Sequence, residues 1–278
     1  MRSFISLSDL RRDDLFALFR LSDDMQKGSY SSLLQDKTVV MFFPQSSLRT
    51  RVSFEKGIRL LGGHPVLFPP ETLDKKEALV DVCGYLENWA DMVIVRHPSI
   101  DLMRQMASHL HIPVINAMSS VNHPCEILSD LYALSKRRSD FLNDRYLFVG
   151  ARGNIGMAWK EAADLLGLDL EQCCPPGYEI DGLSVHHDIL SAVRGKDVVC
   201  TDSLPASAAD AFAPCRVTLD AMGAANPGAV LNPCPPFYRG EEVDAGVIDS
   251  PYFAGYAFKR ALLEVQQAVM AYCMIAEP

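Results

Sequence analysis

Short apolar runs recur along this chain, and polar turns and segments with helical spacing separate them. The apolar runs are 37–43, 64–68, 92–95, 112–115, 146–149, 197–200 and 229–231. The segments with apolar residues at helical spacing are 8–34, 50–61, 76–89, 100–111, 123–138, 154–166 and 256–275. Strands that alternate with helices are typical of parallel sheets, so the pattern predicts an α/β fold.

The pattern of strands and helices starts again after the helix expected at 123–138. A chain of 278 residues is long enough for two medium-sized domains. We therefore expect two doubly wound parallel-sheet domains joined by helices. The first covers 1–130, with the C-terminal helix 256–278 packed back on it, and the second covers 131–255.

Composition excludes several classes of protein. A formal net charge of −9 disfavours a nucleic-acid binder, which usually carries a basic face. The eight cysteines form no C-x-x-C pair and no zinc-type spacing, so we expect no metal site. The N-terminal residues lack the apolar segment of a signal peptide, and no apolar run reaches the length of a membrane span. We expect a soluble cytoplasmic protein with reduced thiols and no membrane partner.

A stretch with two hydroxyls and two arginines, 46–55, follows the first apolar run. A helix N-terminus presents free N–H groups that suit an anion, and Ser47, Arg49 and Thr50 add further donors. Arg51 lies about 200° from Arg49 around a helix, so we expect it to pair with Glu55 instead. The alternative is an ordinary capped helix with solvated arginines.

Three other polar turns follow strands or begin a helix. They are Arg-His-Pro at 96–98, Asn-His-Pro-Cys-Glu at 122–126 and Asn-Pro-Cys-Pro-Pro at 232–236. Ligands of open α/β sheets bind beyond the carboxyl ends of the strands. We therefore expect these turns to contribute to a common crevice.

Together these motifs resemble the aspartate/ornithine carbamoyltransferase family over nearly the whole chain. Ser-Leu-Arg-Thr-Arg at 47–51 resembles the family's Ser-Thr-Arg-Thr-Arg, in the leucine form of the acetylornithine and succinylornithine branch. His-Pro-Cys-Glu at 123–126 resembles His-Pro-x-Gln, and Cys-Pro-Pro at 234–236 resembles Cys-Leu-Pro. The segments 239–243 and 265–271 continue the match.

The resemblance implies transfer of a carbamoyl group from carbamoyl phosphate to an amine, with no cofactor. It implies that the donor is bound by Ser47, the amide of Leu48, Arg49, Thr50, Arg96, His123, Glu126 and the carbonyls of Cys234 and Pro235. Of these, Arg96, His123 and Thr50 would surround the carbonyl oxygen as catalytic groups. Donors at that position stabilise the negative charge that develops during attack.

The segment 72–76 resembles a loop that reaches into a neighbouring subunit in the aspartate branch. The family forms trimers with shared active sites, so the resemblance implies a homotrimer in which Thr72 and Lys76 complete the phosphate pocket of a neighbour. The alternative is a solvated charged loop.

The acceptor site departs most from the family. Asp202 remains, but the ornithine branch's Ser-Met-Gly is missing, and 203–207 reads Ser-Leu-Pro-Ala-Ser. We assign Asp202 to an acceptor ammonium and Asn154 to an acceptor carboxylate. These departures favour an unusual amine such as a short diamino acid over plain ornithine or aspartate.

Three departures concern the donor site. Leu48 replaces a threonine, Glu126 replaces a glutamine, and Leu262 stands where the family has an arginine that Arg260 could replace. They motivate an alternative in which the chain is an inactive member with a scaffold or regulatory role.

The glycines at 150, 153 and 156 follow a strand and also suit a dinucleotide-binding turn. Such a protein usually has an acidic residue at the end of the next strand. Here Asp169 and Glu171 lie near the start of that strand, so the match is poor.

Overall fold

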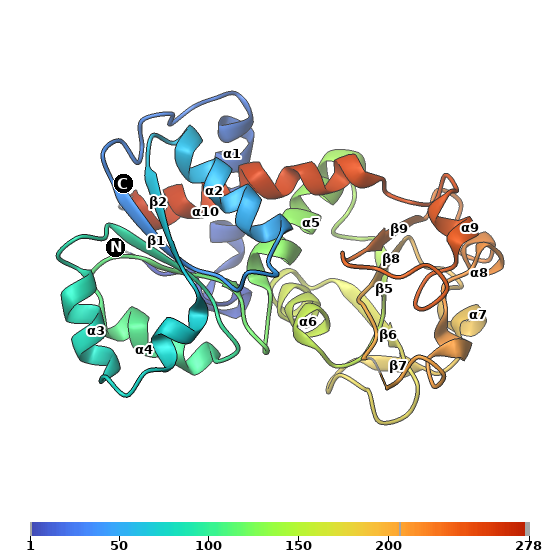
Figure 1. Cartoon of the computed structure of the whole chain (residues 1–278). Coiled ribbons are helices and arrows are strands. Elements are labelled where there is room, and N and C mark those ends of the chain that lie inside the picture. The colour runs from blue at the N-terminus through green and yellow to red at the C-terminus, as the bar shows by residue number, and fades with distance from the viewer. Residues whose placement is uncertain (1, 206, 276–278) are drawn as a thin grey trace. The chain divides into compact units, whose positions relative to one another are not determined.

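Two parallel β-sheets organise the chain, one in each of two units (Figure 1). Unit 1 comprises Met1–Ala133 and Arg260–Pro278, and unit 2 comprises Leu134–Lys259. The computed structural model describes residues 2–205 and 207–275, so the last three residues of the expected C-terminal helix lie outside the described part. No helix in the described part is both long enough and apolar enough to cross a lipid bilayer.

The sheet of unit 1 has four parallel strands in the order β2-β1-β3-β4. The strands are β1 (Thr38–Phe42), β2 (His64–Phe68), β3 (Met92–Arg96) and β4 (Val114–Met118). From β1 the chain moves to one side of the sheet for β2 and to the other for β3. The topological switch point, where α/β sheets bind ligands, therefore lies between β1 and β3.

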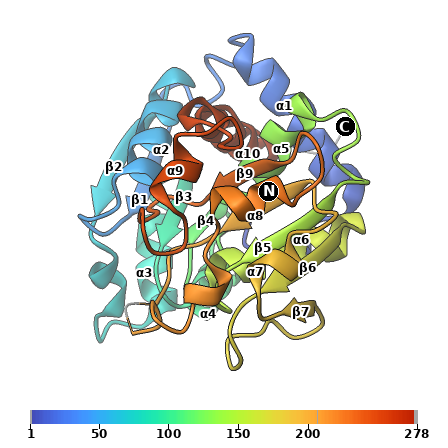
Figure 2. The ribbon, with the colours of Figure 1, turned by 90° about the vertical axis from the view of Figure 1, so that its right-hand side faces the viewer.

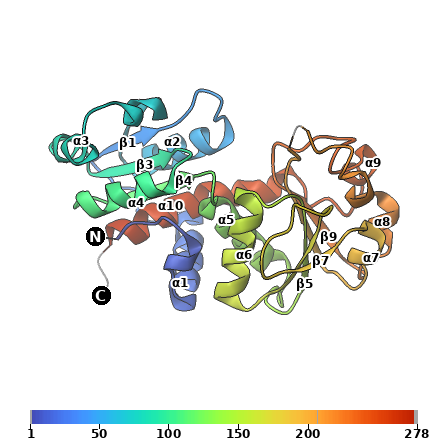
Figure 3. The same ribbon diagram turned by 90° about the horizontal axis from the view of Figure 1, so that it is seen from below.

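Helices cover both faces of this sheet. They are α1 (Arg12–Gln26), α2 (Arg49–Leu60), α3 (Leu79–Leu86), α4 (Ile100–His109), α5 (Pro124–Arg137), whose last residues belong to unit 2, and α10 (Ala261–Met274), with short 3-10 turns η1 (Leu7–Asp9) and η2 (Pro70–Asp74). The 3-10 turn η4 (Tyr256–Arg260) comes at the end of unit 2, just before α10. Side chains of α3 and α4, such as Cys83 and Met103, pack on Val93 and Val95. The C-terminal α10 contacts α1 and α2 (Figure 3). Strands β1, β3 and β4 are buried on both faces, as their apolar sequences predict. The edge strand β2 is partly exposed, with Val66 39% and Phe68 40% exposed.

Several predicted boundaries were wrong. The first helix was expected over 8–34 but ends at Gln26, because Gly28 and Tyr30 adopt positive φ and turn the chain. The strand expected at 112–115 is β4, which lies about two residues further on. Polar Asn116 fits inside it because its amide nitrogen donates to the carbonyl oxygen of Ile5, 2.8 Å away.

The sheet of unit 2 has five parallel strands in the order β7-β6-β5-β8-β9 (Figure 2). The strands are β5 (Arg145–Val149), β6 (Asp169–Cys173), β7 (Ser184–His186), β8 (Val198–Thr201) and β9 (Val230–Pro233). The other elements are α6 (Asn154–Leu166), α7 (Ile189–Ala192), η3 (Ala213–Cys215), α8 (Leu219–Gly223) and α9 (Ala245–Ile248). The switch point of this sheet lies between β5 and β8.

Helix α6 lies on one side of this sheet, and α7 and α8 lie on the other (Figure 3). Trp159 of α6 packs on Tyr146 of β5 with ring centroids 5.8 Å apart. Gly156 lets the helix approach closely, because a Cβ there would lie 2.6 Å from Phe148 and 2.7 Å from Ile180. The glycine motif of this turn is therefore explained by packing between α6 and β5.

Candidate active site

Three predicted site residues meet at the switch point of unit 1. Arg96 ends β3, and Ser47 and Thr50 lie in the turn after β1 and at the start of α2. The Arg96 guanidinium nitrogen Nη1 donates to Ser47 Oγ at 3.0 Å and to Thr50 Oγ1 at 3.4 Å. Both hydroxyl residues are at least 95% buried. The guanidinium and the two hydroxyls thus form one polar cluster at the carboxyl edge of the sheet.

The N-terminus of α2 adds positive potential beside this cluster. Leu48 is the N-cap, its side chain caps no N–H group, and it is 69% exposed. The first N–H groups of the helix therefore stay available to an anion. Arg51 Nε lies 2.7 Å from Glu55 Oε1, which confirms the expected pairing. Arg49 is exposed and has no ion-pair partner among the described residues.

His123 and Glu126 stand at the start of α5, where they are 6% and 5% exposed. A buried polar network holds the preceding turn: Asn116 Nδ2 donates to Asn122 Oδ1 at 2.7 Å, and Ser119 Oγ lies 3.0 Å from the same oxygen. We had not predicted a role for Asn116. The sequence could have indicated it, because an asparagine within an apolar strand needs hydrogen-bond partners for its buried side chain.

The loop that carries Thr72 and Lys76 is anchored at the end of β3. His97 Nε2 lies 3.0 Å from Asp74 Oδ1, and the backbone N–H of Ser99 donates to His97 Nδ1 at 3.1 Å. Because Nδ1 accepts a hydrogen bond, Nε2 carries the proton and donates it to Asp74. Within its own chain, therefore, this loop is held next to Arg96.

Four predicted residues follow strands of unit 2. Asn154 is the first residue of α6, and Asp202 follows β8. A Cβ on Gly153 would lie 3.8 Å from Asp202 Oδ2, so this carboxylate faces the turn between β5 and α6. Cys234 follows β9, is 6% exposed, and donates its N–H to Thr201 O at 3.0 Å, while Pro235 is half-buried.

A further carboxyl group at this edge was missed. Glu242 lies in the loop after β9, is 1% exposed, and accepts at Oε1 from the N–H of Tyr238 at 2.7 Å. Its burial raises the pKa of this carboxyl, and the nearby charges of Glu241 and Asp202 raise it further. We had used the segment 239–243 only as a marker of resemblance.

Other predicted positions take no part in these clusters. Leu262 is buried on α10, whereas the side chain of Arg260 is 80% exposed and lies 4.0 Å from Glu264.

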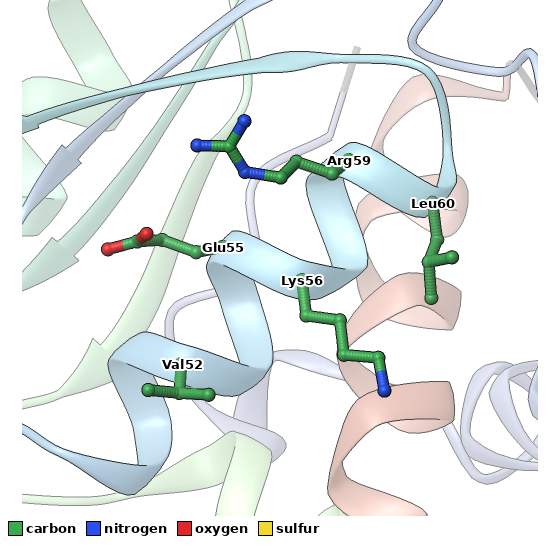
Figure 4. Close-up of a pocket in the computed structure, with 5 residues that line it drawn as sticks. All are labelled: Val52, Glu55, Lys56, Arg59 and Leu60. Atoms are coloured by element: carbon green, nitrogen blue, oxygen red, sulfur yellow. The ribbon is translucent and has the colours of Figure 1, made fainter.

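A hollow of about 370 Å³ lies over the rest of α2, lined by Val52, Glu55, Lys56, Arg59 and Leu60 (Figure 4). Residues 2–205 and 207–275 contain no cluster of three or more potential metal ligands.

The structure of β6 does not support the alternative in which the glycines at 150, 153 and 156 form a dinucleotide-binding turn. Asp169 begins β6 and Cys173 ends it, so the acidic residue lies at the wrong end of the strand.

Comparison with known proteins points to one family. The family model for the aspartate/ornithine carbamoyltransferase carbamoyl-phosphate-binding domain matches residues 2–136, and that for the Asp/Orn-binding domain matches residues 143–273. An ornithine carbamoyltransferase from Halorhodospira halophila is 33% identical over 298 residues, covering 99% of each chain.

Solved structures agree. An ornithine carbamoyltransferase from Burkholderia thailandensis superimposes with a TM-score of 0.90 at 29% identity, covering 99% of each chain. An N-acetyl-L-ornithine transcarbamylase superimposes with a TM-score of 0.85 at 25% identity, covering 98% of this chain and 100% of the other. This chain belongs to the aspartate/ornithine carbamoyltransferase family and is a carbamoyltransferase.

Proposed function

We propose that this carbamoyltransferase moves the carbamoyl group of carbamoyl phosphate to the amine of a short diamino acid rather than to ornithine or aspartate. The observation that carries the donor assignment is the cluster in which Arg96 binds both Ser47 and Thr50. A guanidinium, two hydroxyls and an uncapped helix N-terminus at one switch point form a site for a doubly charged phosphate.

The donor phosphate is bound by Ser47, Thr50, Arg49 and the amide of Leu48. Arg49 is available for this role because, unlike Arg51, it has no carboxylate partner among the described residues. Thr72 and Lys76 complete the pocket of a neighbouring subunit in a homotrimer.

The carbonyl oxygen is held by Arg96, His123 and Thr50. The neutral acceptor amine attacks the carbonyl carbon, and its electron pair forms the new C–N bond. Negative charge develops on the carbonyl oxygen, where these donors stabilise it. The C–O bond to phosphate then breaks, phosphate leaves with the electron pair of that bond, and the proton of the attacking amine passes to the leaving phosphate. Glu126 and the carbonyls of Cys234 and Pro235 accept from the carbamoyl NH₂ group.

The acceptor is bound by unit 2. Asp202 receives its ammonium group, and Asn154 receives its carboxylate. The residues 203–207 lack the ornithine branch's Ser-Met-Gly, which supports an acceptor other than ornithine.

A panel of amines incubated with carbamoyl phosphate tests the proposal, read by phosphate release and by the mass of a ureido product. We expect the highest kcat/KM with a short diamino acid. Preferred turnover of ornithine or aspartate would refute the acceptor assignment. Carbamoyl phosphate binding by calorimetry without turnover of any amine would favour the inactive, regulatory alternative.

A further inference from the structure

Asn116 is a fully buried polar side chain in the middle of the apolar strand β4. Its Nδ2 donates to the carbonyl oxygen of Ile5 at 2.8 Å and to Oδ1 of Asn122 at 2.7 Å. Its own Oδ1 has no hydrogen-bond partner among the described residues. A buried acceptor without a donor costs about 1–3 kcal/mol, so the strand gains from an asparagine here only if the bonds that it donates are needed.

These bonds connect the N-terminal segment to the turn before α5. The N-terminal segment runs along β4: the N–H of Phe4 donates to Val114 O at 2.9 Å, and the N–H of Asn116 donates to Phe4 O at 2.8 Å. Asn122 Nδ2 also lies 3.4 Å from the carbonyl oxygen of Ile5. The side chain of Asn116 therefore fixes Asn122 against backbone that is itself bonded to β4.

Hydrogen bonds fix the turn that ends at Asn122, and His123 follows it directly. Ser119 Oγ accepts from the N–H of Val121 at 3.1 Å and from the N–H of Asn122 at 3.0 Å. On the other side of His123, Pro124 begins α5, and a proline restricts the backbone of the residue before it. The backbone of His123 is therefore held from both sides.

The same turn is bonded to the strand end that carries Arg96. Arg96 pairs with Met118 in the sheet, and the N–H of His97 donates to Met118 O at 3.1 Å. Ser120 donates to Pro98 O through its N–H at 3.0 Å and through its Oγ at 2.7 Å. The turn before α5 and the end of β3 thus form one hydrogen-bonded framework.

We infer that Asn116 is a positioning residue for carbamoyl transfer, which acts through Asn122 to fix the His123 ring against the carbonyl oxygen of carbamoyl phosphate. This inference rests on the proposed function, which assigns His123 to that oxygen. A donor stabilises the transition state only from a fixed position, and a displacement of about 1 Å can lower a rate by about 10²-fold. Asn116 itself touches no substrate in this role.

Asn116→Leu tests the inference, because leucine suits an apolar strand and removes both donated bonds. We expect kcat to fall by about tenfold or more, measured with carbamoyl phosphate and the amine that the panel finds fastest. The Kd of inorganic phosphate, measured by calorimetry, should change by less than about threefold, because Ser47 and Arg49 lie outside this network.

A double-mutant cycle with His123→Ala gives a result that a purely structural role would not produce. His123→Ala alone should lower kcat by about 10²-fold or more, and adding Asn116→Leu should cause no further loss. Additive losses would overturn the inference, as would an unchanged kcat in Asn116→Leu. An unchanged kcat in His123→Ala would instead refute the proposed role of His123, on which the inference depends.

Asn226→Leu is the matched control. Asn226 Nδ2 also donates to a backbone carbonyl, that of Gly195 at 3.1 Å, and to a side-chain oxygen, Asp197 Oδ1 at 2.9 Å. This variant should lower stability and leave kcat unchanged, and an equal loss of kcat in both variants would overturn the inference.

Two further measurements cover a misfolded Asn116→Leu and an acceptor that is still unidentified. Ser119→Ala loosens the same turn and should lower kcat by about threefold, again with no further loss in the His123→Ala background. NMR resonances of the His123 ring, assigned by their absence in His123→Ala, should shift in Ser119→Ala or Asn116→Leu without any acceptor present. Ring resonances that do not move in a folded variant would overturn the inference.

Discussion

The two proposed site regions differ in how their polar side chains are bonded. In unit 1, the hydroxyls of Ser47 and Thr50 already receive hydrogen bonds from Arg96, although Asn116 Oδ1 on β4 has no partner within the described residues. In unit 2, the buried oxygens of Thr201 and Glu242 have no partner within the described residues. The polar cluster at the first edge contains a guanidinium donor, and the second edge carries the two carboxyls of Asp202 and Glu242.

This difference matches the chemistry of the two proposed ligands. A phosphate is bound by donors that are fixed in advance, which reduces the cost of ordering them. We expect a cationic acceptor group to be bound by a carboxylate such as that of Asp202. We therefore expect the phosphate-binding groups to be arranged before carbamoyl phosphate binds. The groups that bind the acceptor are expected to gain hydrogen bonds only when the acceptor is present.

Arg96→Ala should produce the largest effect. It removes a charged donor from the carbonyl oxygen and releases Ser47 and Thr50, so kcat should fall by about 10²–10³-fold. Steady-state kinetics check this, with circular dichroism to confirm the fold. Unchanged kcat would show that the cluster in unit 1 is structural only.

The donor side was more predictable than the acceptor side. A hydroxyl- and arginine-rich turn after an apolar strand has a local physical meaning, and Ser47, Thr50 and Arg96 do lie together. The burial of Glu242 could not be predicted from the neighbouring residues, because it depends on contact with a segment far away in sequence. The N–H of Val217 donates to the carbonyl oxygen of Glu242. Most strands were predicted close to their positions, but β4 lies about two residues further on and β7 (Ser184–His186) was not predicted. Helix ends depended on turns such as that at Gly28.

Arg49→Ala should weaken carbamoyl phosphate binding by about 10- to 100-fold, the usual loss for one charged hydrogen bond. Arg51→Ala is the matched control, because Arg51 is already paired with Glu55. It should change the Kd by about twofold or less, within the usual worth of an exposed pair. Calorimetry separates the two variants, and equal losses would contradict the assignment of Arg49 to the phosphate.

Gly156→Ala tests the interpretation of the glycine motif in unit 2 as packing. The added Cβ would lie 2.6 Å from Phe148, so the unfolding free energy should fall by about 1–3 kcal/mol. Gly84→Ala on α3 is the control, because nothing lies within 4 Å of its Cβ. That change should be neutral or stabilise by up to about 1 kcal/mol. Chemical denaturation measures both, and equal behaviour would contradict the packing interpretation.

Glu242→Gln should stabilise the free protein. The folded pKa of Glu242 is raised above the ordinary value of 4.5 by burial. Its stabilising contribution is therefore complete below that pH and is lost as pH rises through the folded pKa. The variant should gain about 1 kcal/mol of unfolding free energy at pH 7 and nothing near pH 4. A loss of stability at pH 7 would show that the carboxylate is satisfied in the free protein.

Glu126→Gln should have the smallest effect. A carboxylate and an amide oxygen both accept from the carbamoyl NH₂ group, and the family's usual residue at this position is glutamine. We expect kcat/KM to change by less than about threefold, which corresponds to less than about 0.7 kcal/mol. Because Glu126 lies in unit 1 at the start of α5 and is 5% exposed, the result also bears on the contrast between the two edges. A drop of about tenfold or more, read from initial rates across acceptors, would mean that the negative charge itself is used. In that case acceptor recognition would extend into unit 1, and the division between the two edges would have to be redrawn.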